Sequence, residues 1–281
     1  MSIVPKSGIR FSAKRYDQKN LMVTLAQGAV DVLLTAAPDE KVAATFALAD
    51  VWRAGIDVGR ANAPGTPARP ARPELLPPSE MPRRSMGPKG RIAFIHALAH
   101  IELNAVDLAW DIIARFAHLD LPLAYYNDWV NVAVEEAEHY AALAGRLLDL
   151  GAAYGDLPAH NGLWDAARVT ADSFSARLAI VPMTLEARGL DTTPAAIERC
   201  RAAGDSDTAA VLQRIYDDEI KHVRIGVRWF EYCCSQDNQN PQARYAALLA
   251  ERFRGGLKPP FNIPARTRAG MDESYLKPWL S

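Results

Sequence analysis

The chain has 281 residues, of which 49% are hydrophobic, and a formal net charge of −1 at pH 7. This composition allows a large buried core, and the near-neutral charge excludes a global field that would attract nucleic acid or anionic lipid. The first twenty residues lack the apolar segment of a signal peptide, and no later stretch is long and uncharged enough to cross a bilayer. We therefore expect a cytoplasmic protein without a membrane partner.

Three cysteines, two of them adjacent at Cys233 and Cys234, exclude a disulfide framework, and no CxxC spacing indicates a zinc knuckle. A local group of basic residues lies between positions 69 and 91. We interpret it as a solvated linker and do not expect nucleic acid as a partner. The group comprises Arg69, Arg72, Arg83, Arg84, Lys89 and Arg91.

The predicted elements divide the chain into four parts. Residues 1–60 form an N-terminal helical segment, with two short helices between Leu21 and Ile56. Eight prolines within residues 61–90 block helices and sheet ladders, so this part is an extended connector that we expect to lie along the protein surface. Residues 91–240 carry long helical periods, and residues 241–281 form a C-terminal helix and a tail that wraps back.

The long helical periods, without a convincing strand pattern, predict an all-α four-helix bundle. The predicted helices are Arg91–Leu119, Leu123–Leu150, Trp164–Arg188 and Asp205–Cys234, with a short helix near Pro194–Ala203. Pro182 removes a backbone hydrogen bond inside the third helix, so a kink or local widening is expected there. The simpler interpretation is an ordinary helix bend.

Each of the four long helices places a glutamate where the apolar period requires a core residue. These glutamates are Glu102, Glu136, Glu186 and Glu219. An ionised carboxylate in an apolar stripe costs several kcal/mol of desolvation free energy unless it is paired or bound to a metal. The pattern therefore indicates a polar site inside the bundle.

Two of the glutamates begin a Glu-x-x-His motif, which adds His139 to Glu136 and His222 to Glu219. Residues three apart share one face of a helix, so both side chains of each motif can hold the same ion. Glu136 follows Glu102 by 34 residues, and Glu219 follows Glu186 by 33. This near-equal spacing predicts two similar helix hairpins, each contributing one Glu and then Glu-x-x-His.

Four glutamates and two divalent ions form a formally neutral site, so we predict two metal ions. Mixed carboxylate and imidazole ligands favour iron, with manganese as the alternative, whereas structural zinc more often recruits thiolates. We assign no catalytic residue beyond the metal ligands. The acidic residue before each motif predicts an outer hydrogen bond to the histidine of the facing hairpin, from His139 to Asp218 and from His222 to Glu135.

Plainer interpretations apply to several neighbouring residues. A single Glu-x-x-His motif arises by chance on a solvated helix face, and only the combination with two core glutamates predicts a metal site. His96 and His100 lie one turn apart but not on the ligand face, so we interpret them as packing or hydrogen-bonding residues. Glu138 is expected to face solvent, and Tyr140 and Tyr216 to pack in the core.

Longer phrases of the sequence resemble family 455 of the domains of unknown function, a ferritin-like bacterial group, over nearly the whole chain. They are HALAHIELNAVDLAWD, EEAEHY, GAAYGDLPAHNGLWDAA, VPMTLEARGLD, DDEIKHV and LKPPFN. The resemblance implies a ferritin-like bundle whose di-metal ligands match the six positions above, and that ligand set is known from di-iron carboxylate proteins. It implies no substrate.

Three functions remain open at this point. The first is a di-iron oxidoreductase, similar to a hydroxylase, with dioxygen, an electron donor and a small-molecule substrate. A distant resemblance to ferritin-like transfer-RNA hydroxylases makes a nucleoside one candidate substrate. The second is iron handling or other non-catalytic metal binding, although storage requires a hollow assembly and we expect a monomer or dimer. The third is a metal that only holds helices together.

Overall fold

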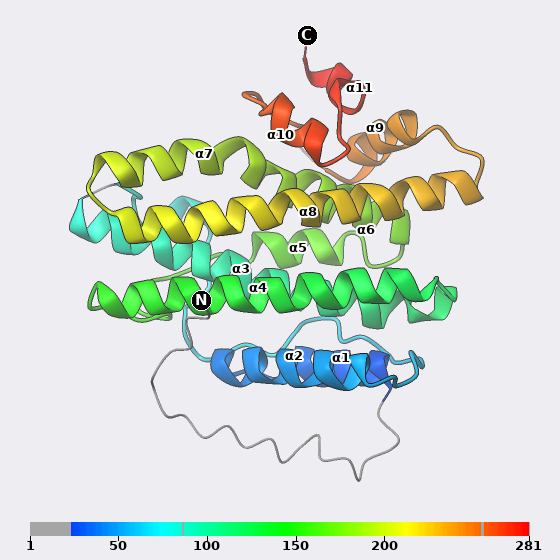
Figure 1. The fold of residues 1–281 in the computed structure, drawn as a ribbon, viewed down its shortest axis with the longest axis horizontal. Helices are drawn as coiled ribbons and strands as arrows, with labels where there is room; N and C mark the ends of the chain where they lie inside the picture. The colour runs from blue at the N-terminus through cyan, green and yellow to red at the C-terminus, as the bar shows by residue number, and fades with distance from the viewer. Residues whose placement is uncertain (1–23, 86, 254–255, 281) are drawn as a thin grey trace.

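The computed structural model describes residues 24–85, 87–253 and 256–280. Within these ranges the chain is an all-α bundle without a β-strand, which confirms the predicted fold class. Figure 1 shows the long helices stacked in layers. The residues before Thr24, which carried the prediction about a signal peptide, lie outside the described residues.

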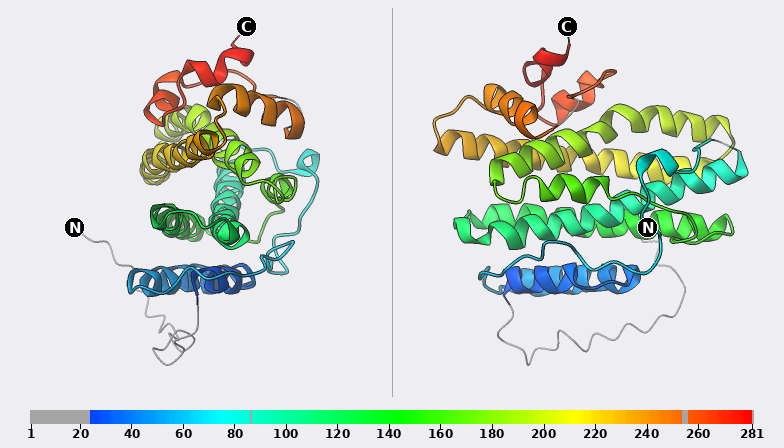
Figure 2. Two further views of the ribbon diagram at one scale, coloured as in Figure 1. Left: turned by 90° about the vertical axis from the view of Figure 1, so that its right-hand side faces the viewer. Right: turned by 180° about the vertical axis from the view of Figure 1, so that it is seen from behind.

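Two short helices form the N-terminal layer, as predicted. They are α1 (Leu25–Leu33) and α2 (Pro38–Arg53). The side chain of Thr24 accepts a hydrogen bond from the Gln27 amide and caps α1, and a proline at the first position of α2 suits a helix start. Figure 2 shows this layer below the bundle, where α1 packs on α3 and α2 packs on α4.

The proline-rich connector lies along the protein surface, as expected from its apolar residues. The Ala68 amide donates to the Leu33 carbonyl (2.8 Å), and the Trp164 indole donates to the Gly65 carbonyl (3.2 Å). Leu75 forms an isolated parallel bridge with Ala159. These contacts satisfy backbone groups that no helix or sheet covers.

Two hairpins of long helices build the bundle. One consists of α3 (Pro88–Phe116) and α4 (Leu123–Asp149), and the second ends in α8 (Ser206–Gln236), which also contacts α4. Gly151 ends α4 in the left-handed region (φ +74°), where glycine has no steric penalty. The core lies where these helices face one another (Figure 2).

The prediction of one continuous helix over Trp164–Arg188 is wrong, because this stretch contains two separate helices, α5 (Gly162–Arg168) and α6 (Phe174–Ile180). Between them, the Thr170 hydroxyl donates to backbone carbonyls of α5 and accepts from Arg177. Short polar side chains that bond to nearby backbone groups compete with helix formation.

The separate helix predicted at Pro194–Ala203 is also wrong, because α7 (Ala187–Ala202) runs continuously through Pro194. A proline inside a helix leaves the carbonyl four residues earlier without its usual donor. Here that carbonyl belongs to Leu190, and the side-chain amide of Asn262 donates to it at 3.1 Å. A residue from the C-terminal tail therefore makes the continuous helix tolerable.

The widening predicted at Pro182 is confirmed by a π-helical segment, Val181–Glu186, that joins α6 to α7. The Thr184 hydroxyl donates to the Ala179 carbonyl at 2.8 Å, which satisfies a group inside the widened turn. On the facing helix α8, a Cβ atom at Gly226 would lie 2.6 Å from the Pro182 ring, so only glycine leaves room for it.

The C-terminal region packs back on α7 and α8. Arg266 forms a buried bidentate ion pair with Asp191 of α7, with distances of 2.9 and 2.7 Å. The helices of this region are α9 (Pro241–Arg252), α10 (Ile263–Arg268) and α11 (Glu273–Leu276).

One helical stretch in the described part of the chain, Pro88–Leu119, is long and apolar enough for a membrane span, with a mean hydropathy of 1.3. However, 78% of its most apolar window is buried inside the protein. The stretch contains α3, whose neighbours are α1 and α4. Its apolar composition is therefore that of a helix buried in a protein core.

Replacing Gly226 by Ala tests the close packing of α8 on the π-helical segment. Because the added methyl group would overlap a rigid proline ring, Gly226→Ala should lower the free energy of unfolding by about 1–3 kcal/mol. Gly145→Ala in α4 is the matched control, since a Cβ there meets nothing within 4 Å. It should raise the free energy of unfolding by about 0.5–1 kcal/mol. Urea unfolding followed by circular dichroism measures both, and equal stability changes would contradict the packing argument.

Candidate metal centre

The structure brings predicted ligand residues of three long helices together. Glu102 comes from α3, Glu136 and His139 from α4, and Glu219 from α8. One ligand-type atom from each of these four buried residues lies within 4.8 Å of the other three. They therefore form one compact group inside the bundle.

Glu136 lies between the two imidazoles. Its Oε2 atom is 3.4 Å from His139 Nδ1, and its Oε1 atom is 2.9 Å from His222 Nδ1. Glu102 Oε2 is also 3.4 Å from His139 Nδ1, and Glu219 Oε1 is 3.6 Å from His222 Nδ1. The ring centroids of the two histidines are 5.8 Å apart. Each imidazole thus faces two carboxylates, and Glu136 is common to both.

Glu186, the remaining predicted ligand, ends the π-helical segment and is not part of this compact group of four. The residue as a whole is partly exposed, but its Oε2 atom is buried and has no hydrogen-bond partner. Burial raises the pKa of Glu186 well above its usual range, and the nearby charge of Glu219 raises it further. The role of Glu186 as a metal ligand therefore remains a prediction.

Several ligand-type atoms of this group are buried without a hydrogen bond. They are Glu136 Oε1, Glu186 Oε2, Glu219 Oε2 and His222 Nδ1. Although Glu136 Oε1 and His222 Nδ1 are only 2.9 Å apart, they do not have hydrogen-bond geometry. Leaving a buried polar atom unsatisfied costs about 1–3 kcal/mol. The arrangement therefore lacks a partner that these atoms can share.

The spacing of these atoms fits a divalent cation. Nitrogen and oxygen ligands lie about 2.1 Å from such an ion, so two of them at a right angle are about 3 Å apart. The measured separations of 2.9 and 3.4 Å between imidazole nitrogens and carboxylate oxygens match this value. The residues present therefore fit a metal ion, with both carboxylate and imidazole donors.

The pKa values in the group also indicate an excess of buried negative charge. Burial raises the pKa of Glu102 and Glu219, and the negative charge of Glu136 raises both further. Burial alone would lower the pKa of His139, yet the surrounding carboxylates raise it to about 12. The carboxylates therefore hold protons on the imidazoles or on one another unless cations replace those protons.

The outer ring nitrogen, Nε2, of each ligand histidine lies beside a carboxylate of the facing helix. His139 Nε2 lies 3.1 Å from Asp218 Oδ2, and His222 Nε2 lies 2.7 Å from Glu135 Oε2. These are the two pairings that the sequence pattern predicted, and their importance for metal binding remains a prediction. An N–H that donates to a carboxylate fixes the imidazole tautomer and leaves Nδ1 free to bind a cation.

The sequence did not predict the charged side chains that surround these outer carboxylates. Lys221 Nζ is 2.6 Å from Asp218 Oδ1 and 3.6 Å from Glu135 Oε1. Arg214 is 3.8 Å from Asp218 and pairs with Glu138, beside a surface hollow that reaches His139. The only sequence signal for these contacts was the helical spacing of Asp218 from Lys221 and Arg214, which is common on solvated helices.

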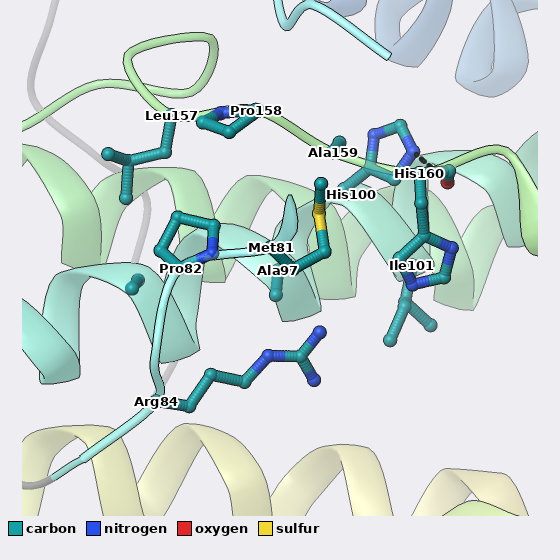
Figure 3. Close-up of a pocket in the computed structure, with 11 residues that line it drawn as sticks. Met81, Pro82, Arg84, Ala97, His100, Ile101, Leu157, Pro158, Ala159 and His160 are labelled. Carbon is teal, nitrogen blue, oxygen red and sulfur yellow. Dashed lines mark hydrogen bonds between the residues drawn. The ribbon is translucent and has the colours of Figure 1, made fainter. Parts of the chain in front are cut away.

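The histidines of α3 outside the ligand face have structural partners, as predicted. His100 is 2.8 Å from the Tyr154 hydroxyl and 3.1 Å from the His160 carbonyl, and His96 accepts from the Gly155 amide. Figure 3 shows His100 and its bond to the His160 carbonyl beside a small hollow under the connector. Burial lowers the pKa of His100 to about 4, so its imidazole is a neutral packing group.

The tyrosines near the ligands also have structural contacts. Tyr140 is buried and packs edge-on against Tyr154, with ring centroids 5.4 Å apart. The Tyr216 hydroxyl accepts a hydrogen bond from the Asn262 side chain at 3.2 Å. Both residues therefore stabilise the packing around the centre.

Comparison with known proteins identifies the family of the chain. The family model described as "Protein of unknown function (DUF455)" matches residues 34–277, so the chain belongs to this family. A protein of Haemophilus influenzae, named "Uncharacterized protein", is 37% identical over 219 residues, which cover 76% of each chain. No solved structure matches the chain.

Removing the carboxylate of Asp218 tests its contribution to metal binding. Asp218→Ala should weaken Mn²⁺ binding by about 10–100-fold, because His139 loses the group that orients its ring. Asp217→Ala is the matched control, since Asp217 is the exposed neighbour and accepts a hydrogen bond from the Gln213 side chain on the same helix. The electron paramagnetic resonance signal of free Mn²⁺ measures the affinity. Equal affinities for the two variants would contradict the predicted contribution.

Proposed function

We propose that this chain is a ferritin-like di-metal oxidoreductase that uses dioxygen, similar to a hydroxylase. The observation that carries the proposal is the position of Glu136, with one oxygen toward each of two imidazoles. A carboxylate between two imidazole-containing ligand sets is suited to join two metal ions. Two Glu-x-x-His motifs with two further glutamates are the ligand set of di-iron carboxylate bundles.

The six proposed ligands divide between two ions. Glu102 and His139 would hold one ion, Glu219 and His222 the other, with Glu136 shared and Glu186 beside Glu219. Two divalent ions balance the four glutamates, so a buried centre would be formally neutral. We propose iron, with manganese as the alternative, because hard oxygen donors and imidazoles suit both metals.

The protein contributes ligand geometry and a dry environment to this chemistry. When bound, a reduced metal pair supplies electrons to dioxygen. Burial of Glu102, Glu136 and both histidines excludes bulk water from the centre. Asp218 and Glu135 keep a proton on the outer nitrogen of each histidine, so that the inner nitrogens face the carboxylates.

Hydroxylation defines the remaining partners of the proposed enzyme. One oxygen atom of dioxygen enters a substrate C–H bond, and the other leaves as water with two protons and two electrons from an external donor. A small molecule or nucleoside is the proposed substrate. Binding to an intact nucleic acid is not part of the proposal, because Arg69 and Arg91 of the basic group pair with buried Asp107 and Asp205.

We further propose that the enzyme works in the cytoplasm as a monomer or dimer. Helix layers cover the long helices on two opposite sides (Figure 2), and buried Asp107 of α3 pairs with Lys41 of the N-terminal layer and with Arg69 of the connector. Storage of iron would require a hollow assembly of many chains. Light scattering should therefore give a particle of one or two chains.

Anaerobic loading with Fe²⁺ tests the proposed function. The wild-type chain should bind two equivalents, and exposure to dioxygen should produce a new absorption band as the iron is oxidised. His222→Ala should lower the stoichiometry, because it removes a buried ligand of one ion. Two bound ions that do not react with dioxygen would instead indicate a structural or metal-binding protein. Rapid oxidation by a large hollow particle would indicate iron handling.

A further inference from the structure

One exposed lysine contacts both carboxylates that hold the ligand histidines. Lys221 Nζ is 2.6 Å from Asp218, whose other oxygen is 3.1 Å from His139. The same nitrogen is 3.6 Å from Glu135, whose other oxygen is 2.7 Å from His222. A single ammonium group therefore contacts both carboxylate–imidazole pairs.

The two hairpins are not equivalent at this position. Lys221 precedes His222 directly, and the corresponding residue before His139 is Glu138. Glu138 forms an ion pair with Arg214, and Arg214 is also 3.8 Å from Asp218. Among the described residues, Lys221 is the cation that contacts both outer carboxylates. The two hairpins have similar ligand spacing, but only the hairpin that contains α8 carries a lysine directly before its ligand histidine.

We infer that Lys221 is a positioning residue that holds Asp218 and Glu135, and through them both ligand imidazoles, in the orientation needed to bind the two metal ions. The inference rests on the proposed metal centre. The side chain of Lys221 is 55% exposed, so an ordinary surface ion pair at this position would contribute little to the stability of the fold.

The effect on the metal ions has a different physical origin. Asp218 and Glu135 carry like charges, and Glu135 is 31% exposed on its side chain. Without the shared ammonium group, mutual repulsion and hydration favour rotation of these carboxylates toward solvent. Each histidine would then lose the acceptor that fixes its tautomer and ring orientation.

The affinity for Zn²⁺ distinguishes a positioning role of Lys221 from simple repulsion between its positive charge and the metal ion. Zn²⁺ is measured in competition with a chromophoric chelator for the wild type, Lys221→Met and Lys221→Arg. If Lys221 positions the ligands, Lys221→Met should weaken binding about tenfold, the lower end of the loss for an outer partner of a ligand. Lys221→Arg should recover most of that loss. If Lys221 acts only as a nearby positive charge, its removal should tighten binding, and this result or an unchanged affinity overturns the inference.

The imidazole N–H protons give a second measurement, since Zn²⁺ is diamagnetic. In the wild type, each ligand histidine should show one N–H resonance that exchanges slowly with water. Lys221→Met should accelerate exchange of both resonances, because one ammonium group serves both carboxylates. Asp218→Asn should affect only the resonance of His139. Unchanged exchange in Lys221→Met, or a change at one histidine alone, contradicts a shared positioning role.

Arg201→Met is the matched control for loss of an exposed cation. Arg201 is 52% exposed and pairs with Glu198 on the same helix, α7. This variant should match the wild type in affinity and proton exchange. A wild-type chain that binds no Zn²⁺ would overturn the proposed centre, whereas normal wild-type binding with an unaffected Lys221→Met would overturn only the inference about Lys221.

Discussion

Compensation of buried negative charge is the constraint that organises this bundle. The helices α3, α4 and α8 and the π-helical segment each place a buried glutamate oxygen in the interior, and α4 and α8 also place a histidine there. Desolvation of one such charge costs several kcal/mol even after relaxation, so the group cannot exist as isolated anions. The outer carboxylates Asp218 and Glu135 contact the two histidines, and Lys221 contacts both of these carboxylates. These outer contacts add alternating charges around the buried group.

The helix α3 shows how the protein treats buried carboxylates elsewhere. On the side away from Glu102, Asp107 pairs with Lys41 and Arg69, and Asp111 pairs with Arg177. Lys41, Arg69 and Arg177 come from other elements, and Asp111 also pairs with Arg115 of α3 itself. In the described part of the chain, Glu102, Glu136 and Glu219 instead contact imidazoles, which bind metals as neutral groups. This contrast within one helix favours cations from solution as the missing partners.

The sequence predicted the features that depend on local periodicity. The long helices and the carboxylates in their apolar stripes follow from spacing alone. The widening at Pro182 follows from the backbone hydrogen bond that a proline cannot donate. The break at Thr170 and the continuous helix through Pro194 depend on side-chain hydrogen bonds, and the second comes from Asn262, far along the chain. Lys221 was missed because a lysine on an exposed helix face gives no periodic signal.

The π-helical segment connects the fold to the fourth glutamate. A π turn contains one residue more than an α turn, which rotates the following residues by about 100° relative to a regular helix. Glu186 ends this segment, so the direction of its carboxylate depends on the widening. Gly226 leaves space for the proline, and Tyr245 of α9 lies 2.9 Å from the Thr184 hydroxyl. The C-terminal helix α9 therefore supports the widened segment that ends in a proposed metal ligand.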